Sequence, residues 1–125
     1  MSYTITIIES DEFLQDLTKD RLIEEGFVVH GACTGKEGVD CIQEHTPDLI
    51  LLDLDLPDVE ANEYLVKIKQ DPNCEDVAII GFSNIGNPAD MKCVKDHCLD
   101  DVIIKSTATL EDIIASVKKI QKASQ

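Results

Sequence analysis

Residues 47–58 read PDLILLDLDLPD. The four apolar residues at 49–52 follow the chain-breaking Pro47, and an uninterrupted apolar run of this length is typical of a strand that is buried on both faces of a sheet. Two acidic residues, Asp53 and Asp55, come directly after the run. This stretch therefore predicts a central parallel strand that ends in carboxylates.

Apolar runs and segments of helical periodicity alternate on both sides of this stretch. Strands joined by a single helix run parallel, and right-handed crossovers then place helices on both faces of the sheet. We predict an α/β fold with a doubly wound, five-stranded parallel sheet, formed by residues 1–125 as one domain. The expected strands are 3–8, 27–30, 49–52, 77–82 and 102–104, and the expected helices are 11–25, 34–44, 62–70, 89–97 and 110–120.

The chain of 125 residues carries 25 acidic and 11 basic side chains, which give a formal charge of −14. Such a charge repels phosphate backbones and anionic lipids, so we expect neither a nucleic-acid partner nor a membrane partner. No apolar run approaches the roughly 18 residues that cross a bilayer, and the N-terminal segment lacks the basic residues of a signal peptide. The cytoplasm is the expected location.

The five cysteines contain no CxxC pair, and in a reducing compartment we expect them to act as small hydrophobic side chains. Cys93, His97 and Cys98 lie close enough in sequence to suggest a metal site, but a fourth ligand at suitable spacing is missing. We therefore interpret these three residues as one helix face and its end.

Charged and hydroxyl side chains follow four of the five expected strands. They are Glu9, Ser10 and Asp11 after the first strand, Asp53 and Asp55 after the third, Ser83 after the fourth and Lys105 after the fifth. In a doubly wound sheet the functional site lies beyond the carboxyl ends of the strands, so we expect these side chains to converge on one edge. Each type also has an ordinary structural interpretation, because acids begin helices, Asp and Ser form turns, and lysines are solvated.

This combination of residue types favours phosphoryl transfer onto a carboxylate. Clustered carboxylates repel one another unless a cation joins them, and Mg²⁺ is bound by one or two carboxylates together with water. A carboxylate can also act as a nucleophile toward phosphorus, while a lysine and a hydroxyl stabilise the phosphoryl oxygens. The sequence has no Walker loop and no GxGxxG fingerprint that would indicate nucleotide chemistry.

Three segments carry a strong resemblance to the receiver domains of two-component response regulators: IIESDEFLQDLTKDRLIEEGF (7–27), PDLILLDLDLPD (47–58) and LDDVIIKS (99–106). The resemblance covers nearly the whole chain and implies a flavodoxin-like (βα)5 fold with strand order 2-1-3-4-5. Asp53 matches the phosphoacceptor of the family. Ser83 matches its switch Ser/Thr, and Lys105 matches the lysine that pairs with the phosphoryl group.

The resemblance also implies a Mg²⁺ site. Glu9, Asp53 and the backbone carbonyl of Asp55 are the expected ligands, and Ser10 and Asp11 are additional candidates. The family usually has two adjacent acids after the first strand. Ser10 stands in place of the second acid, so we expect Mg²⁺ binding to be weakened.

The chain departs from the family pattern at other positions as well. Val102 stands where the family usually has an aromatic switch residue, Ser106 replaces the usual proline after the lysine, and Asn84 replaces a small residue after the switch hydroxyl. The loop NIGNP at 84–88 is also unusual for the family.

Two functional interpretations of the resemblance stay open. In the first, the chain is a stand-alone receiver of a phosphorelay, in which Asp53 accepts a phosphoryl group from a histidine kinase or phosphotransfer protein. The fourth helix, fifth strand and fifth helix would then signal to a downstream protein by contact. In the second, the chain is a pseudo-receiver that docks proteins without phosphorylation. Neither interpretation makes it an enzyme beyond weak autophosphatase activity.

A small phosphohydrolase is the alternative from another functional class. It would need a second acid two residues after the nucleophile, a spacing that Asp53 and Asp55 have. No insertion of a length that could cap a substrate is present, however. A flavin site is disfavoured because the acidic segment ESDE at 9–12 would repel the flavin phosphate.

Overall fold

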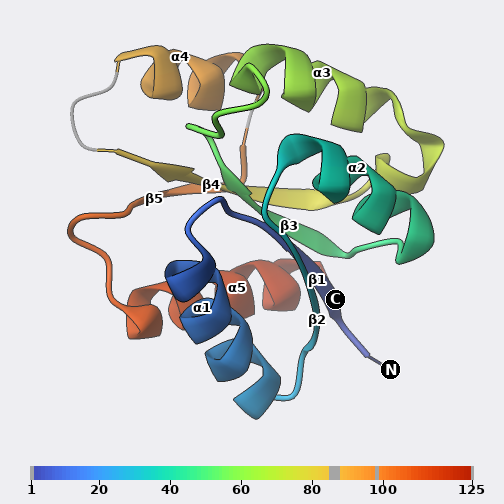
Figure 1. Ribbon diagram of the computed structural model, residues 1–125. Coiled ribbons are helices and arrows are strands. Elements are labelled where there is room, and N and C mark those ends of the chain that lie inside the picture. The colour runs from blue at the N-terminus through green and yellow to red at the C-terminus, as the bar shows by residue number, and fades with distance from the viewer. Residues whose placement is uncertain (1, 85–87, 98, 125) are drawn as a thin grey trace.

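Five parallel strands form the centre of the computed structural model, which describes residues 2–84, 88–97 and 99–124. The sheet order is β2-β1-β3-β4-β5, as Figure 1 shows. The strands are β1 (Thr4–Ile8), β2 (Val28–Ala32), β3 (Leu49–Asp53), β4 (Ala78–Ser83) and β5 (Asp101–Ile104). All four strand pairs are parallel, so the predicted doubly wound fold and its strand order are confirmed.

Across the described ranges, helices cover both faces of this sheet (Figure 1). On one face lie α1 (Glu12–Glu24) and α5 (Leu110–Ala123). On the other lie α2 (Gly35–Glu44), α3 (Ala61–Gln70), the short 3-10 helix η1 (Pro72–Cys74) and α4 (Pro88–His97). Within the same ranges no helix is long and apolar enough to cross a bilayer.

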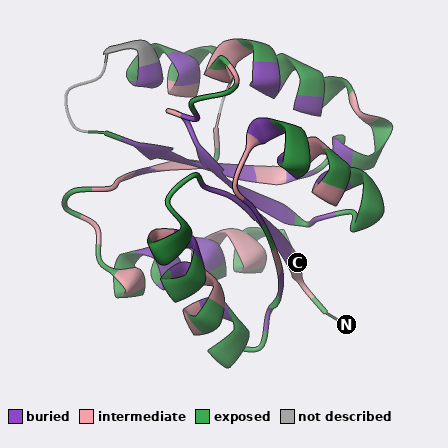
Figure 2. Ribbon diagram, viewed as in Figure 1, coloured by how far each residue is buried: buried purple, intermediate pink, exposed green. Residues whose placement is uncertain are grey.

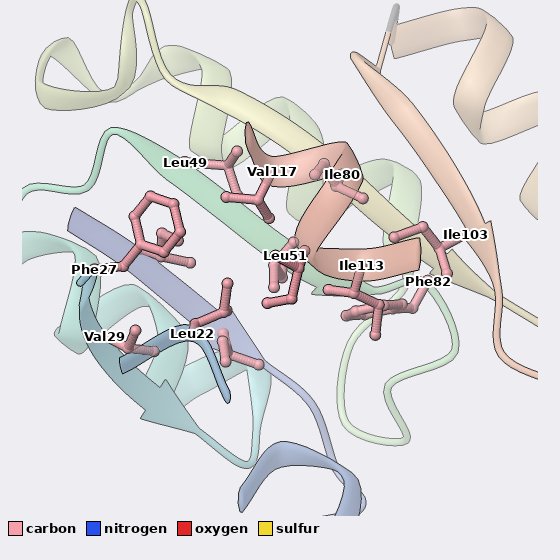
Figure 3. Packing of buried hydrophobic residues seen from close by; sticks show 13 residues of the cluster. Leu22, Phe27, Val29, Leu49, Leu51, Ile80, Phe82, Ile103, Ile113 and Val117 are labelled. Carbon is pink, nitrogen blue, oxygen red and sulfur yellow. The ribbon is translucent and has the colours of Figure 1, made fainter. Parts of the chain in front are cut away.

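Two apolar clusters separate the sheet from its helical layers. All five residues of β3 are buried, and alternate side chains of this strand enter opposite clusters. Figure 3 shows the cluster under α1 and α5, in which Leu51 and Ile80 of the sheet lie near Ile113 and Val117 of α5. Figure 2 shows the result: β3 is buried, the outer strands β2 and β5 are only partly buried, and the helices expose their outer faces.

The observed elements differ from the predicted ones mainly at their ends. β2 extends to Ala32 instead of ending at residue 30, because Gly31 and Ala32 continue the pairing with β1. In the 84–88 loop, Pro88 is the first residue of α4, and residues 85–87 lie outside the described ranges.

Helix α1 has an unusual distribution of polar and apolar side chains. The apolar Phe13 and Leu17 are 73% and 41% exposed, whereas the polar Gln15 and Thr18 are buried. Gln15 Nε2 donates to the backbone carbonyls of Glu9 at 3.1 Å and Ala32 at 2.8 Å. These carbonyls lie just past β1 and at the end of β2. The buried Gln15 side-chain amide donates a hydrogen bond to each of them, which an apolar side chain at this position could not do.

Helix α2 packs very closely against its neighbours, because glycine occupies two of its buried positions. Tyr64 of α3 donates its hydroxyl proton to the carbonyl of Gly35 at 2.6 Å. A Cβ atom at Gly38 would lie 2.5 Å from Tyr64 Oη and 2.7 Å from Ile8 Cδ1. Both distances are shorter than a normal contact, so a side chain at position 38 would have to displace the side chains of Tyr64 and Ile8.

Gly38→Ala is therefore expected to lower the free energy of unfolding by roughly 1 to 2 kcal/mol, because overpacking outweighs the better helix propensity of alanine. Urea denaturation measures the change. Asp40→Ala, an exposed position on the same helix, is the matched control and should cost little. A Gly38→Ala protein as stable as the parent would show that α2 does not pack this closely.

Candidate functional site

Three charged side chains meet beyond the carboxyl ends of the strands. Glu9 follows β1, Asp53 ends β3 and Lys105 follows β5. The Lys105 ammonium lies 2.9 Å from Glu9 Oε1 and 3.2 Å from Asp53 Oδ2, and it donates to Glu9 Oε2 at 3.1 Å. Both carboxylate side chains are about 1% exposed, and the Lys105 side chain is 20% exposed. One ammonium group therefore bridges two buried carboxylates.

The backbone of the strand ends fixes this arrangement. Asp53 pairs in register with Phe82 of β4, and the Lys105 amide donates to the carbonyl of Ser83 at 2.9 Å. The Glu9 amide donates to the carbonyl of Ala32 at 3.0 Å. Hydrogen bonding between neighbouring strands thus continues one residue past β1 and past β5. This continuation brings side chains that are distant in sequence to the same edge of the sheet.

The pKa values of the two buried carboxyl groups, Glu9 and Asp53, are shifted in opposite directions. Burial and a hydrogen bond to Asp53 raise the pKa of Glu9, against the opposing effects of Lys105 and the Asp11 amide. Burial also raises the pKa of Asp53, but hydrogen bonds from the Glu9 carboxyl and the Asp55 amide, with the Lys105 charge, outweigh it and lower that pKa. As the pH falls, Glu9 is therefore the member of the pair that takes up a proton first.

Lys105 stays cationic between these acids. Burial lowers the pKa of its ammonium, but the hydrogen bond to Glu9 and the charge of Asp53 outweigh burial and raise it. An anionic carboxylate beside a fixed cation is suited to nucleophilic attack on an electrophilic phosphorus and to charge stabilisation of the incoming group.

The segment after β1 divides its side chains between the site and the first helix. Ser10 Oγ donates to Asp53 Oδ2 at 3.2 Å, so it faces the acceptor carboxylate. Asp11 caps α1 instead, since its Oδ1 accepts from the amides of Phe13 at 3.0 Å and Leu14 at 3.2 Å. Of the two interpretations that the sequence leaves open for Asp11, the helix-start interpretation describes its contacts.

Ser83 lies at the same edge but its hydroxyl points to another acid. Ser83 Oγ lies 2.8 Å from Asp90 Oδ2 and 3.0 Å from the carbonyl of Asn84. Burial and the neighbouring Asp55 carboxyl raise the pKa of Asp90, against the hydrogen bond from Ser83, which lowers it. The sequence does not single out Asp90, because an acid in the first turn of a helix is an ordinary helix-start residue.

Asp55 contributes to the site through its backbone and its side chain. Its amide donates to Asp53 Oδ1 at 2.8 Å, which orients the acceptor carboxylate. Its carboxyl group interacts with Asp90. The second acid of the DLD segment thus belongs to the neighbouring Ser83–Asp90 contact.

The carboxylate oxygens of Glu9 and Asp53 are of the type that binds a hard divalent cation, but of the residues that the structure describes only these two side chains supply them. Two buried carboxylates lie side by side, and Mg²⁺ in proteins is commonly held by one or two carboxylates with water completing its coordination. Over the described residues, no group of three His, Cys, Asp or Glu side chains is arranged to hold a metal. The donor types fit Mg²⁺, and the Ser10 hydroxyl lies beside Asp53 where a third carboxylate would add to the set.

The Cys93–His97–Cys98 segment behaves as a helix face as far as it is described. Cys93 is 1% exposed within the apolar cluster under α2, α3 and α4. His97 Nε2 lies 3.0 Å from Asn62 Oδ1 of α3. Cys98 lies outside the described residues. Cys33, Cys41, Cys74 and Cys93 are free thiols.

The family model of the response regulator receiver domain matches residues 5–118. The chain belongs to this family. The receiver is 31% identical over 121 residues to the phosphate regulon transcriptional regulatory protein PhoB of Rhizobium meliloti, an alignment that covers 97% of this chain and 53% of PhoB. It is 35% identical over 71 residues to the chemotaxis protein CheY of Bacillus subtilis, covering 56% of this chain and 59% of CheY. The matched parts therefore span between half and three fifths of these two relatives.

Other relatives match over more of their length. The receiver is 27% identical over 105 residues to the polar-differentiation response regulator DivK of Brucella ovis, covering 84% of this chain and 85% of DivK. Among solved structures, a CheY-like receiver domain protein of Methanospirillum hungatei superposes with a TM-score of 0.88 at 25% identity, covering 98% and 96% of the two chains. CheY4 of Vibrio cholerae, with a TM-score of 0.86 at 14% identity and coverage of 96% and 99%, shares the fold.

Proposed function

We propose that this receiver accepts a phosphoryl group on Asp53 from the phosphohistidine of a histidine kinase or phosphotransfer protein. The observation that carries the proposal is the anionic Asp53 carboxylate held 3.2 Å from the Lys105 ammonium at the carboxyl edge of the sheet. The family is a signalling fold and not a known enzyme family, so the transfer serves to change contacts rather than to turn over a substrate. Mass measurement of the intact chain after incubation with acetyl phosphate and Mg²⁺ tests the proposal.

The reaction is a single displacement at phosphorus. An oxygen of Asp53 forms a bond to phosphorus while the phosphorus–nitrogen bond of the donor histidine breaks, and the imidazole leaves with the electron pair of that bond and takes a proton. Lys105 then pairs with the oxygens of the new acyl phosphate, whose charge is close to −2. Glu9 keeps a second contact to Lys105 and so holds the ammonium at the edge.

Glu9, Asp53 and the backbone carbonyl of Asp55 are the residues that would hold Mg²⁺ in this proposal. Receiver domains usually bind Mg²⁺ in this acidic pocket, where the ion supplies positive charge against the phosphoryl oxygens. Ser10 would face the ion with a hydroxyl in place of a carboxylate, since its Oγ already lies 3.2 Å from Asp53 Oδ2.

Ser10→Asp is expected to tighten Mg²⁺ binding by about tenfold or more, which corresponds to about 1.4 kcal/mol. The reason is that a third carboxylate would join Glu9 and Asp53 at a position that already reaches the acceptor. Calorimetric titration with Mg²⁺ measures the affinity, and Ser10→Asn is the neutral control of similar size. Equal affinities for Ser10→Asp and the native chain would show that residue 10 does not reach the ion.

A pseudo-receiver that docks proteins without phosphorylation is the second candidate. The observation that favours it is the engagement of Ser83 with Asp90, which directs the switch hydroxyl to a partner other than Asp53. A phosphohydrolase would need Asp55 as a general acid next to the nucleophile, whereas the Asp55 carboxyl interacts with Asp90. Failure of acetyl phosphate to change the mass of the native chain would favour the docking module.

The output surface in this proposal is the face of α4, β5 and α5, through which a downstream protein would be contacted. Val102 on β5 is half-buried and has no ring that could turn with Ser83, so the signal would pass through the backbone of α4 and β5 instead. The cytoplasmic location and the lack of a nucleic-acid partner stay predictions from charge and sequence.

A further inference from the structure

The contact between Ser83 and Asp90 joins two deeply buried side chains. Ser83 is 1% exposed and Asp90 is 3% exposed, and Ser83 Oγ lies 2.8 Å from Asp90 Oδ2. Ser83 is the last residue of β4, while Asp90 lies in the first turn of α4. The contact therefore ties the end of a central strand to the start of a helix on the proposed output face.

A serine hydroxyl has a single proton to donate. While this proton is donated to Asp90, it cannot be donated to a phosphoryl oxygen on Asp53. The hydrogen bond from Ser83 to Asp90 belongs to a strong class, because its acceptor is a carboxylate that is shielded from water. Ser83 must leave Asp90 before it can respond to phosphorylation.

We propose that Asp90 is a positioning residue that holds Ser83 in the resting state of the receiver. Phosphorylation of Asp53 then sets two acceptors, the phosphoryl group and the Asp90 carboxylate, in competition for one hydroxyl proton. When the phosphoryl group prevails, Asp90 loses the hydroxyl donor of Ser83 and keeps the backbone amide of Asn84, so one of the contacts that hold the first turn of α4 to the end of β4 is broken. This inference rests on the proposed function, since it assumes that Asp53 is the acceptor.

Affinity for beryllofluoride, which mimics a phosphoryl group on a carboxylate, tests this competition in the presence of Mg²⁺. We expect Asp90→Ala to bind beryllofluoride about tenfold more tightly than the native chain, because the Ser83 hydroxyl is then held only by the neutral carbonyl of Asn84. In a Ser83→Ala background the same substitution should change the affinity by less than about twofold. Fluorine NMR titration gives the affinities of all four proteins.

Three further variants separate positioning from charge and from structure. Asp90→Asn keeps an oxygen that accepts from Ser83 but makes the hydrogen bond a weaker, neutral one, so it should gain clearly less affinity than Asp90→Ala. Asp96→Ala removes an exposed acid from the same helix and should also leave the affinity unchanged. If Asp90→Ala does not fold at the assay temperature, Asp90→Ser provides a small polar replacement that is too short to reach the same position.

The outcomes distinguish this inference from the proposed function. A tenfold gain that persists in the Ser83→Ala background, or that Asp90→Asn shares, would mean that the charge of Asp90 acts directly on the anion and would overturn the inference alone. Equal affinities of the native chain and Asp90→Ala would overturn it as well. Absence of both a beryllofluoride adduct and a phosphoryl mass gain on the native chain would overturn the proposed function and the inference together.

Discussion

Asp53→Asn is expected to abolish the phosphoryl mass gain that acetyl phosphate and Mg²⁺ produce on the native chain. Asparagine has nearly the same shape, and its side-chain oxygen can still accept from the Asp55 amide, which donates to Asp53 Oδ1 at 2.8 Å. What it lacks is the anionic oxygen that forms the bond to phosphorus. The loss should therefore be complete while the fold is kept. Intact-protein mass spectrometry over a time course measures the adduct.

Asp11→Asn is the matched control for this substitution. Asp11 lies at the same edge, but its carboxylate caps α1, and asparagine caps helices about as well as aspartate. Phosphorylation of Asp11→Asn should therefore proceed at close to the native rate. A phosphoryl adduct of undiminished amount on Asp53→Asn would place the acceptor on another residue and contradict the proposed function.

Lys105→Met is expected to lower the free energy of unfolding at neutral pH by roughly 2 to 3 kcal/mol. Removing one partner of a buried ion pair costs about 3 to 5 kcal/mol, and we place this case below that range because the Lys105 side chain is 20% exposed. The substitution leaves Glu9 and Asp53, each about 1% exposed in its side chain, without the cation that bridges them. Urea denaturation at several pH values measures the loss, and Lys119→Met at an exposed position of α5 is the control.

The loss on Lys105→Met should shrink as the pH falls. A carboxyl group whose pKa is raised by folding, as in Glu9, contributes stability below its ordinary pKa that is lost as the pH rises through its raised value. The pKa of Asp53 is lowered, so Asp53 contributes stability above its ordinary pKa that is lost as the pH falls through the lowered value. Lys105 lowers both pKa values. Without Lys105, burial of the ionised Glu9 carboxylate costs more folding stability at neutral pH. This added cost disappears once Glu9 is protonated. A loss that did not change between neutral and acidic pH would contradict the assigned charges.

Much of the fold could be predicted from the sequence, because its main signals are local. The apolar run of β3 identifies a strand buried on both faces, and the alternation of strand and helix patterns then leaves a parallel sheet as the simplest arrangement. The same reasoning placed Glu9, Asp53 and Lys105 at one edge, where the structure brings them into contact.

The parts that could not be predicted depend on tertiary contacts. Nothing in the sequence distinguishes Asp90, which is buried against Ser83, from an exposed acid in the first turn of a helix. In α1 the apolar spacing indicates a helix, yet Phe13 is exposed and Gln15 is buried. Gln15 is inside because its amide donates to the carbonyls of Glu9 and Ala32, and these two carbonyls are near each other only once β1 and β2 are side by side.

The bridging position of Lys105 also bears on how fast a donor can react. A free lysine side chain carries about 2 kcal/mol of rotamer entropy, which must be lost when it is fixed on a phosphoryl group. Here the contacts to Glu9 and Asp53 have already removed much of that freedom in the resting receiver. In the proposed function, the arrival of a phosphoryl group would then be an exchange of partners by an ammonium group that is already held in place.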